Sequence, residues 1–274
     1  FSMVRSLWSA ASGMIAQQTN LDTISNNLAN VNTTGYKTDV AEFKSLLYQT
    51  MQTKTTTANG QNKPVGAQVG LGVRNSSINS MFTQGNMLES TSTSAFGIEG
   101  KGFFAVRGED GQTYYTRNGN FLWATDNGNI TLTTTAGLPV LDSNGNKISF
   151  NSSQYMTSSI TITGDGEICY PNATNNAQSL GIKIGLYQFQ NPSGLEKMDS
   201  SLYAVSAASG QAMNEAVTAG LTKSKVNQGY LEGSNVQVVD EMVNMIVAQR
   251  AYEMNSKAIQ ATDEMMSQAN NLRR

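Results

Sequence analysis

The 274-residue chain contains no histidine. Histidine is the commonest general base, the usual activator of serine and cysteine nucleophiles and the commonest zinc ligand, so its absence disfavours most enzyme classes. Two carboxylates such as Asp110 and Asp126 could still serve a glycosidase, but both occur in glycine-containing turns, where acidic residues are expected for backbone reasons. We therefore expect no enzymatic activity, no catalytic residue, no cofactor and no bound metal.

Cysteine and charge are also scarce. The single cysteine, Cys169, excludes an intrachain disulfide and cysteine-based metal clusters, and its strand-like surroundings predict a small buried core residue. Charged residues make up 14% of the chain and the net charge is -2. Because such a chain carries no basic field that could attract phosphates, nucleic acid is an unsuitable partner, and no site for a small-molecule substrate is evident.

Long hydrophobic runs are missing as well. No stretch approaches the roughly 20 apolar residues of a membrane-spanning helix. Near the N-terminus, Ser9, Ser12 and Gln17 interrupt any apolar segment that could act as a secretory signal peptide. We therefore expect neither a transmembrane helix nor a signal peptide of this type.

What the chain does have is an apolar stripe near each end. In the first 35 residues, apolar side chains recur at alternating spacings of three and four, which predicts a long amphipathic helix. The stripe consists of Leu7, Ala10, Met14, Leu21, Ile24, Leu28 and Val31. Asn26, Asn27, Asn30 and Asn32 lower helix propensity, which leaves two interpretations: a frayed helix end, or amides that bond neighbouring helices in a crowded bundle.

A second stripe predicts a C-terminal helix over residues 234–274, with Ser234 and Gln237 as a capping box. This stripe consists of Val236, Val239, Val243, Ile246, Val247, Ala251, Met254, Ala258, Ala261, Met265 and Leu272. Each stripe could pack on its own domain, but the strand-like middle offers no matching helical groove. We predict that the two helices pack against each other as a coiled-coil-like stem, with Gln17 and Arg250 helping to set their register.

The middle of the chain reads as an inserted, mainly antiparallel β domain, so the predicted fold class is α+β. We divide it into an extended arm or loop at 36–68, a β-rich domain at 69–205 and a returning arm at 206–233. Asp110-Gly111, Asn118-Gly119, Asn127-Gly128 and Asn144-Gly145 are typical of tight hairpin turns. Strands are predicted at 69–73, 77–82, 95–98, 103–107, 113–116, 120–124, 129–134, 160–163, 167–170, 180–189, 195–198 and 202–205.

Four segments resemble the bacterial flagellar rod and hook (axial) proteins. They are SNNLANVNT at 25–33, the block at 82–106, YTRNGNF at 115–121 and VNMIVAQRAYEM at 243–254. The overall length and QGYLEGSNV at 228–236 are most similar to a distal rod subunit, with a proximal rod or hook paralogue as the alternative. The resemblance implies a structural subunit of the basal body that polymerises helically into the shaft transmitting torque to the hook.

The resemblance also implies partners and a location. The partners would be further copies of the chain, proximal rod and hook or hook-junction subunits, ring bushing proteins where an outer membrane exists, and the flagellar type III export apparatus. The location would be extracytoplasmic, in the periplasm of a two-membrane cell. A rival interpretation is a surface carbohydrate-binding or adhesin module that uses exposed Tyr114, Tyr115 and Trp123.

The assembly interface is expected to lie on the two terminal stripes and the asparagine-rich segment. Its predicted residues are Leu7, Met14, Leu21, Ile24, Asn27, Leu28, Asn30, Val31, Val239, Val243, Ile246, Val247, Arg250, Ala251, Met254, Ala258, Ala261 and Met265.

Overall fold

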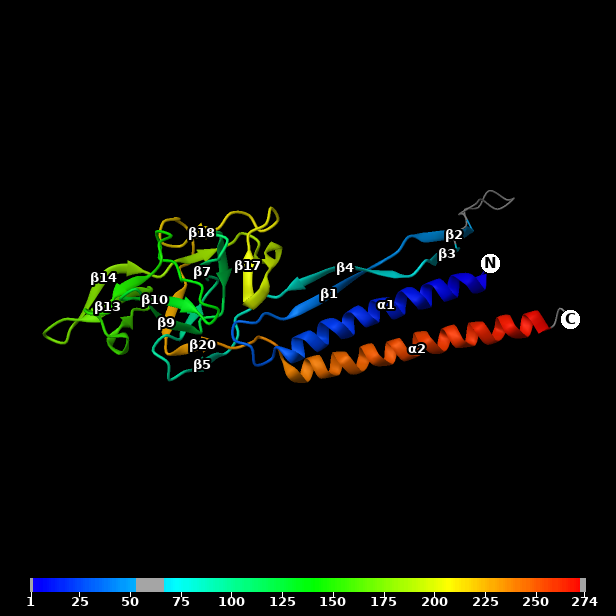
Figure 1. Ribbon diagram of the computed structural model, residues 1–274. Helices are drawn as coiled ribbons and strands as arrows, with labels where there is room; N and C mark the ends of the chain where they lie inside the picture. Colours follow the sequence, from blue (N-terminus) through cyan, green and yellow to red (C-terminus); the bar gives the residue numbers. More distant parts are fainter. Residues whose placement is uncertain (1, 53–66, 272–274) are drawn as a thin grey trace. The chain divides into compact units, whose positions relative to one another are not determined.

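The computed structural model describes residues 2–52 and 67–271. The chain divides into two compact units, shown with the elements labelled in Figure 1. We call them the helical unit (1–29, 39–79 and 237–274) and the β unit (30–38 and 80–236). The described residues combine a helix near each end with many antiparallel strands, which confirms the α+β class.

The helical unit is built on α1 (Ser2–Ala29) and α2 (Val238–Asn271), which lie side by side and antiparallel (Figure 1). Asp240 and Glu241 in the first turn of α2 suit the positive end of its dipole. The helix begins four residues later than the predicted start, because the first helical bond runs from the Glu241 amide to the Gln237 carbonyl. Ser234 does not cap it. The Ser234 hydroxyl instead accepts a bond from the Val236 amide, two residues on.

A strand ribbon accompanies the helices in the same unit. Strand β1 (Asp39–Ser45) pairs with β4 (Val73–Ser80), and β2 (Tyr48–Gln52) pairs with β3 (Ala67–Gly70). The ribbon follows α1 (Figure 1), and the Val73 amide donates to the Ser12 hydroxyl at 3.3 Å. Most of the predicted loop, 53–66, lies outside the described residues; the rest of the predicted arm contains β1 and β2.

The β unit carries the other strands. They are β5 (Met87–Glu89), β6 (Phe96–Glu99), β7 (Phe103–Arg107), β8 (Thr113–Thr116), β9 (Phe121–Asp126), β10 (Asn129–Thr134), β11 (Ser149–Asn151), β12 (Thr161–Ile162), β13 (Glu167–Pro171), β14 (Ala177–Lys183), β15 (Leu186–Gln188), β16 (Glu196–Lys197), β17 (Leu202–Ala204), β18 (Met213–Asn214), β19 (Lys225–Gln228) and β20 (Tyr230–Glu232). Short 3-10 turns are η1 (Thr157–Ser159), η2 (Pro192–Gly194) and η3 (Asp199–Ser201).

The largest sheet of the described residues has the order β16-β17-β8-β7-β15-β18. Two further sheets have the orders β11-β10-β9 and β12-β13-β14, and β19-β6 and β20-β5 form two-stranded pairs. Every one of these pairings is antiparallel. The segment 206–233, which we expected to be a returning arm, therefore supplies strands β18, β19 and β20 to this unit.

Two of the predicted turns have different roles. Asn127 (φ 48°) and Gly128 (φ 81°) form the two-residue connection between β9 and β10, and both are left-handed, as a type I′ hairpin requires. Gly119 was predicted to form such a turn but does not have a positive φ. Its Cβ position would lie 1.6 Å from the Phe96 carbonyl oxygen, so glycine is needed there for close backbone approach.

The core lies on both faces of β7. Phe104 and Val106 belong to one buried cluster, while Phe103 and Ala105 belong to another that includes Tyr115. This is why the strand reads as a continuous apolar run instead of alternating with polar residues. Cys169 is buried in β13, as expected.

Burial of Tyr115 makes the stability of the β unit sensitive to alkali. Burial, reinforced by the neighbouring Tyr187, raises the pKa of Tyr115 to about 12. The folded state favours the neutral phenol. The contribution of Tyr115 to the free energy of unfolding is therefore complete below the ordinary pKa near 10 and is lost as pH rises to about 12. At about 1.4 kcal/mol per pKa unit, the loss amounts to about 2–3 kcal/mol.

We therefore expect Tyr115→Phe to reduce the fall in the urea midpoint between pH 9 and pH 11.5. Trp123 fluorescence reports the unfolding of this unit, with Trp8 replaced by Phe in all variants. Tyr48→Phe is the control, because Tyr48 is 61% exposed and lies in the helical unit. An equal alkaline loss in Tyr115→Phe and the parent would show that Tyr115 does not carry this sensitivity.

Candidate assembly interface

Most of the predicted interface residues on α2 are exposed. Val239 and Met254 are 73% and 70% exposed, and Val243, Ile246, Val247 and Met265 lie between 49% and 62%. Val239, Val243 and Ile246 are spaced by four and three residues, so they share one side of the helix. We call Val239, Val243, Ile246, Val247 and Met254 the outer face of α2. A contiguous apolar surface of this kind is unusual unless it contacts another molecule.

The side of α2 that faces α1 combines small, polar and apolar residues. The buried residues described in α2 are Glu241, Ala248 and Thr262, which are multiples of seven positions apart. Asn255 belongs to the same series and meets Gly13 of α1, where a Cβ atom would lie 2.8 Å from the Asn255 amide nitrogen. Ile259 and Met266 lie on the same side of the helix and are half-buried.

The prediction that the apolar stripe of α2 packs against α1 is consequently wrong. Ile246 precedes Ala248 by two residues, and two residues correspond to about 200° around an α-helix. Ile246, and Val239 seven residues before it, therefore point almost directly away from α1. Of the other predicted residues, Ala251 is half-buried, and Ala258 and Ala261 are exposed.

Helix α1 agrees better with the predicted stripe. Ala10 and Ile24 are buried. The remaining predicted apolar residues, Leu7, Met14, Leu21, Leu28 and Val31, are half-buried. The predicted stripe does not include Trp8 and Ile15, which are 70% and 68% exposed and stand seven residues apart. The seven-residue spacing is visible in the sequence, but neither residue belongs to the predicted stripe.

Asn27 is an internal connector of the helical unit. Its Nδ2 donates to the Asp39 carbonyl at 2.8 Å and to Glu241 Oε2 at 3.4 Å, while its Oδ1 accepts from the Asp39 amide at 2.9 Å. The residue is 1% exposed. Its amide thus does bond another helix, as one interpretation suggested, but that helix is α2 of the same chain. Asn30 is half-buried, and its side chain accepts a bond from Thr33.

Arg250 does not set the register of the two helices. It lies on the exposed side of α2, and its guanidinium pairs with Glu253 of the same helix at 3.2 Å. Exposed pairs of this type contribute little to stability.

The β unit also contains a buried ion cluster that was not predicted from the sequence. Lys37 Nζ lies 2.7 Å from Glu232 Oε1, and Arg117 Nε lies 2.9 Å from Glu232 Oε2. The Lys37 and Glu232 side chains are 0% exposed, and that of Arg117 is 3% exposed. Burial lowers the pKa of Lys37; the Glu232 carboxylate opposes this shift, and the Arg117 charge adds to it.

The remaining donors of the two cations are satisfied by backbone and amide oxygens. Lys37 Nζ also donates to the Thr83 carbonyl at 2.6 Å. Arg117 Nη1 donates to the carbonyls of Gly100 and Gly102, and Nη2 donates to Gln84 and to Glu232 Oε1. Nothing in the residue spacing pointed to this cluster, because its members are widely separated in the chain. One carboxylate thus serves two buried cations.

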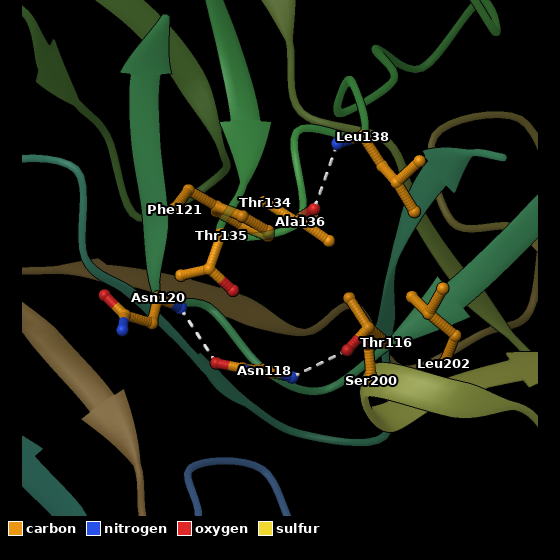
Figure 2. A pocket seen from close by; sticks show the side chains of 10 residues that line it. All are labelled: Thr116, Asn118, Asn120, Phe121, Thr134, Thr135, Ala136, Leu138, Ser200 and Leu202. Carbon is orange, nitrogen blue, oxygen red and sulfur yellow. Dashed lines mark hydrogen bonds between the residues drawn. The ribbon is translucent and has the colours of Figure 1, made fainter. Parts of the chain in front are cut away.

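Two cavities in the described part of the β unit are too small for an ordinary ligand. Thr116, Asn118 and Thr134 line one beside β8 and β10, drawn in Figure 2 with the bonds between its residues; its volume is about 20 Å³. That is room for about one water molecule. A second cavity, beside Phe103 and Phe189, measures about 200 Å³, below the roughly 300–1,000 Å³ of typical ligand pockets.

The aromatic residues of the adhesin interpretation do not form a binding platform. Tyr115 is 6% exposed, and Trp123 packs against Phe150. The Tyr114 hydroxyl donates to Asp110, and this hydrogen bond lowers the pKa of the Asp110 carboxyl, which disfavours a role as general acid. In the described part of the chain, no group of acidic or cysteine side chains could hold a metal ion, and no helix is long and apolar enough to cross a membrane.

Comparisons with known proteins agree along the whole chain. Residues 7–37 match the family described as flagella basal body rod protein, 97–170 the flagellar hook protein FlgE/F/G D1 domain, and 227–272 the flagellar basal body rod FlgEFG protein C-terminal region. The flagellar basal-body rod protein FlgG of Borreliella burgdorferi is 43% identical, with 99% of this chain and 100% of that protein covered. FlgG of Agrobacterium fabrum is 41% identical, with 96% and 97% covered. FlgG of Bacillus subtilis is 38% identical, with 99% and 100% covered.

The role of Asn27 can be tested by Asn27→Ala. The substitution removes the hydrogen bonds that Asn27 makes to the half-buried Asp39 backbone and to buried Glu241, so we expect the helical unit to lose about 1–3 kcal/mol. Circular dichroism at 222 nm during urea titration measures the loss. Asn32→Ala is the control, since Asn32 belongs to the same motif but is exposed. Identical helical transitions for the two variants would refute the connector role.

Proposed function

Because the chain belongs to the FlgG family of flagellar basal-body rod proteins, we propose that it is a structural subunit of the distal rod. In this proposal it polymerises helically into the shaft that transmits torque to the hook. The observation that carries the proposal is the outer face of α2. Its exposed valine, isoleucine and methionine side chains are suited to burial against neighbouring subunits.

The distribution of apolar surface in the helical unit supports this function. The fully buried side chains described in α2 are Glu241, Ala248 and Thr262, and the apolar Ile259 and Met266 on the same side are half-buried. The most exposed apolar side chains of α2, Val239 and Met254, lie on other sides of the helix. At about 25 cal/mol per Å² of apolar surface, burying them between subunits would stabilise the polymer more than the monomer.

We propose that further copies of this chain cover the outer face. A growing shaft requires a contact between different surfaces of successive subunits, because a symmetric contact would stop at a dimer. Trp8 and Ile15 of α1 provide a second exposed apolar surface on the helical unit that such a contact could use. The predicted residues Leu21 and Leu28 are half-buried and lie on a different side of α1 from Trp8 and Ile15.

A coiled-coil-like stem is the finer form of this proposal. The seven-residue spacing of Glu241, Ala248, Asn255 and Thr262 is typical of a left-handed supercoil. The seam itself would contain the polar residues Glu241, Asn255 and Thr262 beside apolar Ile259 and Met266, whereas we predicted a seam of the apolar stripe. Polar seam residues specify register and cost stability, which suits a helix pair that is completed by its neighbours.

The remaining partners and the location are proposed on the same basis. They are proximal rod and hook or hook-junction subunits, ring bushing proteins where an outer membrane is crossed, and the type III export apparatus, with an extracytoplasmic position in the basal body. The alternative is another axial paralogue. The flagellar hook-basal body complex protein FlhP of Bacillus subtilis is 30% identical over 99% of the chain, which is less than the FlgG proteins above.

A charge on the outer face should stop assembly. We expect Ile246→Asp to abolish polymerisation, because a carboxylate would be buried between subunits, and to leave the urea midpoint of the β unit unchanged. Negative-stain microscopy and sedimentation of concentrated protein measure assembly. Gln260→Asp is the matched control: it adds the same charge at an exposed polar position of α2. Straight tubes from Ile246→Asp would contradict the proposed interface.

The same reasoning predicts labile chain ends before assembly. Few side chains of α2 are fully buried in the monomer, so burial offsets only part of the backbone entropy of ordering, about 1–2 kcal/mol per residue. We expect limited proteolysis of the monomer to remove residues from α1 and α2 first, and assembly to protect them. Ends that resist protease in a proven monomer would show that the helical unit is stable without its neighbours.

A further inference from the structure

The last residues of the β unit form a segment that we call the C-terminal strap, residues 230–235. It comprises β20 and the three residues that follow, and β20 pairs with β5. The strap brings Glu232 to the two buried cations, Lys37 and Arg117. Those cations come from segments that are far apart in the sequence, since Lys37 precedes the first strand of the chain and Arg117 follows β8.

The strap also completes backbone hydrogen bonds of the segments around it. Glu232 accepts from the amides of Gly85, through its side chain, and Gly35, through its carbonyl. The Gly233 amide donates to the Asn86 carbonyl at 2.7 Å. Asn235 accepts from the Thr38 amide and donates to the Met81 carbonyl, each at 2.8 Å. Several segments of the β unit therefore depend on the strap for their hydrogen bonds.

The strap is seated without spare room. A Cβ atom at Gly85 would lie 2.1 Å from the Gly233 carbonyl oxygen, so the two backbones are in direct contact. A side chain at position 85 would keep the strap from its place while leaving every charge intact.

Without the strap, the cations would be buried with carbonyl and amide oxygens but without the carboxylate that pairs with both. Removing one partner of a buried ion pair is strongly destabilising, because the remaining charge is desolvated without compensation. Here one absent carboxylate would leave two such charges.

We propose that the strap is a folding gate: the β unit becomes stable only when Glu232 is seated between Lys37 and Arg117. Since the strap is the last segment of this unit to be synthesised, a chain that still lacks it would stay open. The use of such a gate rests on the proposed function, because a subunit destined for a structure outside the cytoplasm has to remain unfolded until it has been exported. The gate itself is a property of the monomer.

Native-state hydrogen exchange of the unmodified full-length chain tests the gate directly. The strap is reported by the amides of Gly35, Gly85 and Gly233, and the core by those of Leu132 and Val140, which are hydrogen-bonded and buried. If the gate is correct, both sets exchange through the same global opening, with equal protection and equal dependence on urea. Strap amides that exchange on the order of tenfold faster than the core, with a weaker urea dependence, would overturn it.

Two substitutions test the gate by separate routes. Glu232→Gln removes the carboxylate charge, and Gly85→Ala places a Cβ atom where the Gly233 carbonyl of the strap lies. We expect each to raise the ratio of unfolded to folded β unit on the order of 100-fold or more, measured from the urea midpoint by Trp123 fluorescence in the Trp8→Phe background. Glu89→Gln is the matched control, because Glu89 is exposed on β5 beside the strap. A midpoint of Glu232→Gln equal to that of Glu89→Gln would refute the gate.

The combined variant adds a further test. Because both substitutions unseat the same strap, their joint effect should be smaller than the sum of the separate effects, whereas full additivity would count against the gate. All these measurements use unassembled protein, so they are independent of the outer face of α2. Failure of the gate would leave assembly intact, and failure of Ile246→Asp to block assembly would leave the gate intact.

Discussion

The pairing of one buried carboxylate, Glu232, with two buried cations is the constraint on which the β unit depends. Charged residues are uncommon in this chain, at 14%, yet these three lie where water does not reach them. A buried charge is tolerated only when it is paired and hydrogen-bonded, so the surrounding backbone has to come within bonding distance. Glycine at position 85 satisfies that demand, because its missing side chain lets the strap carbonyl approach.

In the helical unit, polar side chains are buried while large apolar side chains are exposed. Its internal contact contains the buried side chains of Asn27, Glu241 and Thr262, while Ile246 and Val247 are exposed. A unit arranged in this way leaves apolar surface that contact with other molecules can bury. The two units therefore differ. The β unit pairs its buried charges internally, and the helical unit keeps apolar side chains exposed that we propose are buried on assembly.

The strands were predictable where the pattern and the local geometry agreed. β9 and β10 joined by Asn127-Gly128 are an example, because strand alternation and a left-handed turn are both local properties. The strand predicted at 180–189 is interrupted between β14 and β15 because Gly185 passes close to the Asp142 carbonyl, a contact that alternation cannot reveal. The stripe of α2 was read correctly as apolar and amphipathic, but periodicity does not say which side of a helix meets which partner.

The sequence by itself determined the α+β class, a long helix near each end, the positions of most strands and, through its resemblance, the family. These depend on neighbours along the chain, whose spacing and turn chemistry can be read directly. Only the tertiary structure decided that Asn27 bonds within its own chain, that Asn255 meets Gly13 between the two helices, and that Lys37 and Arg117 share Glu232. Those arrangements join residues far apart in the chain, and a single sequence carries no spacing rule for side chains brought together only by folding.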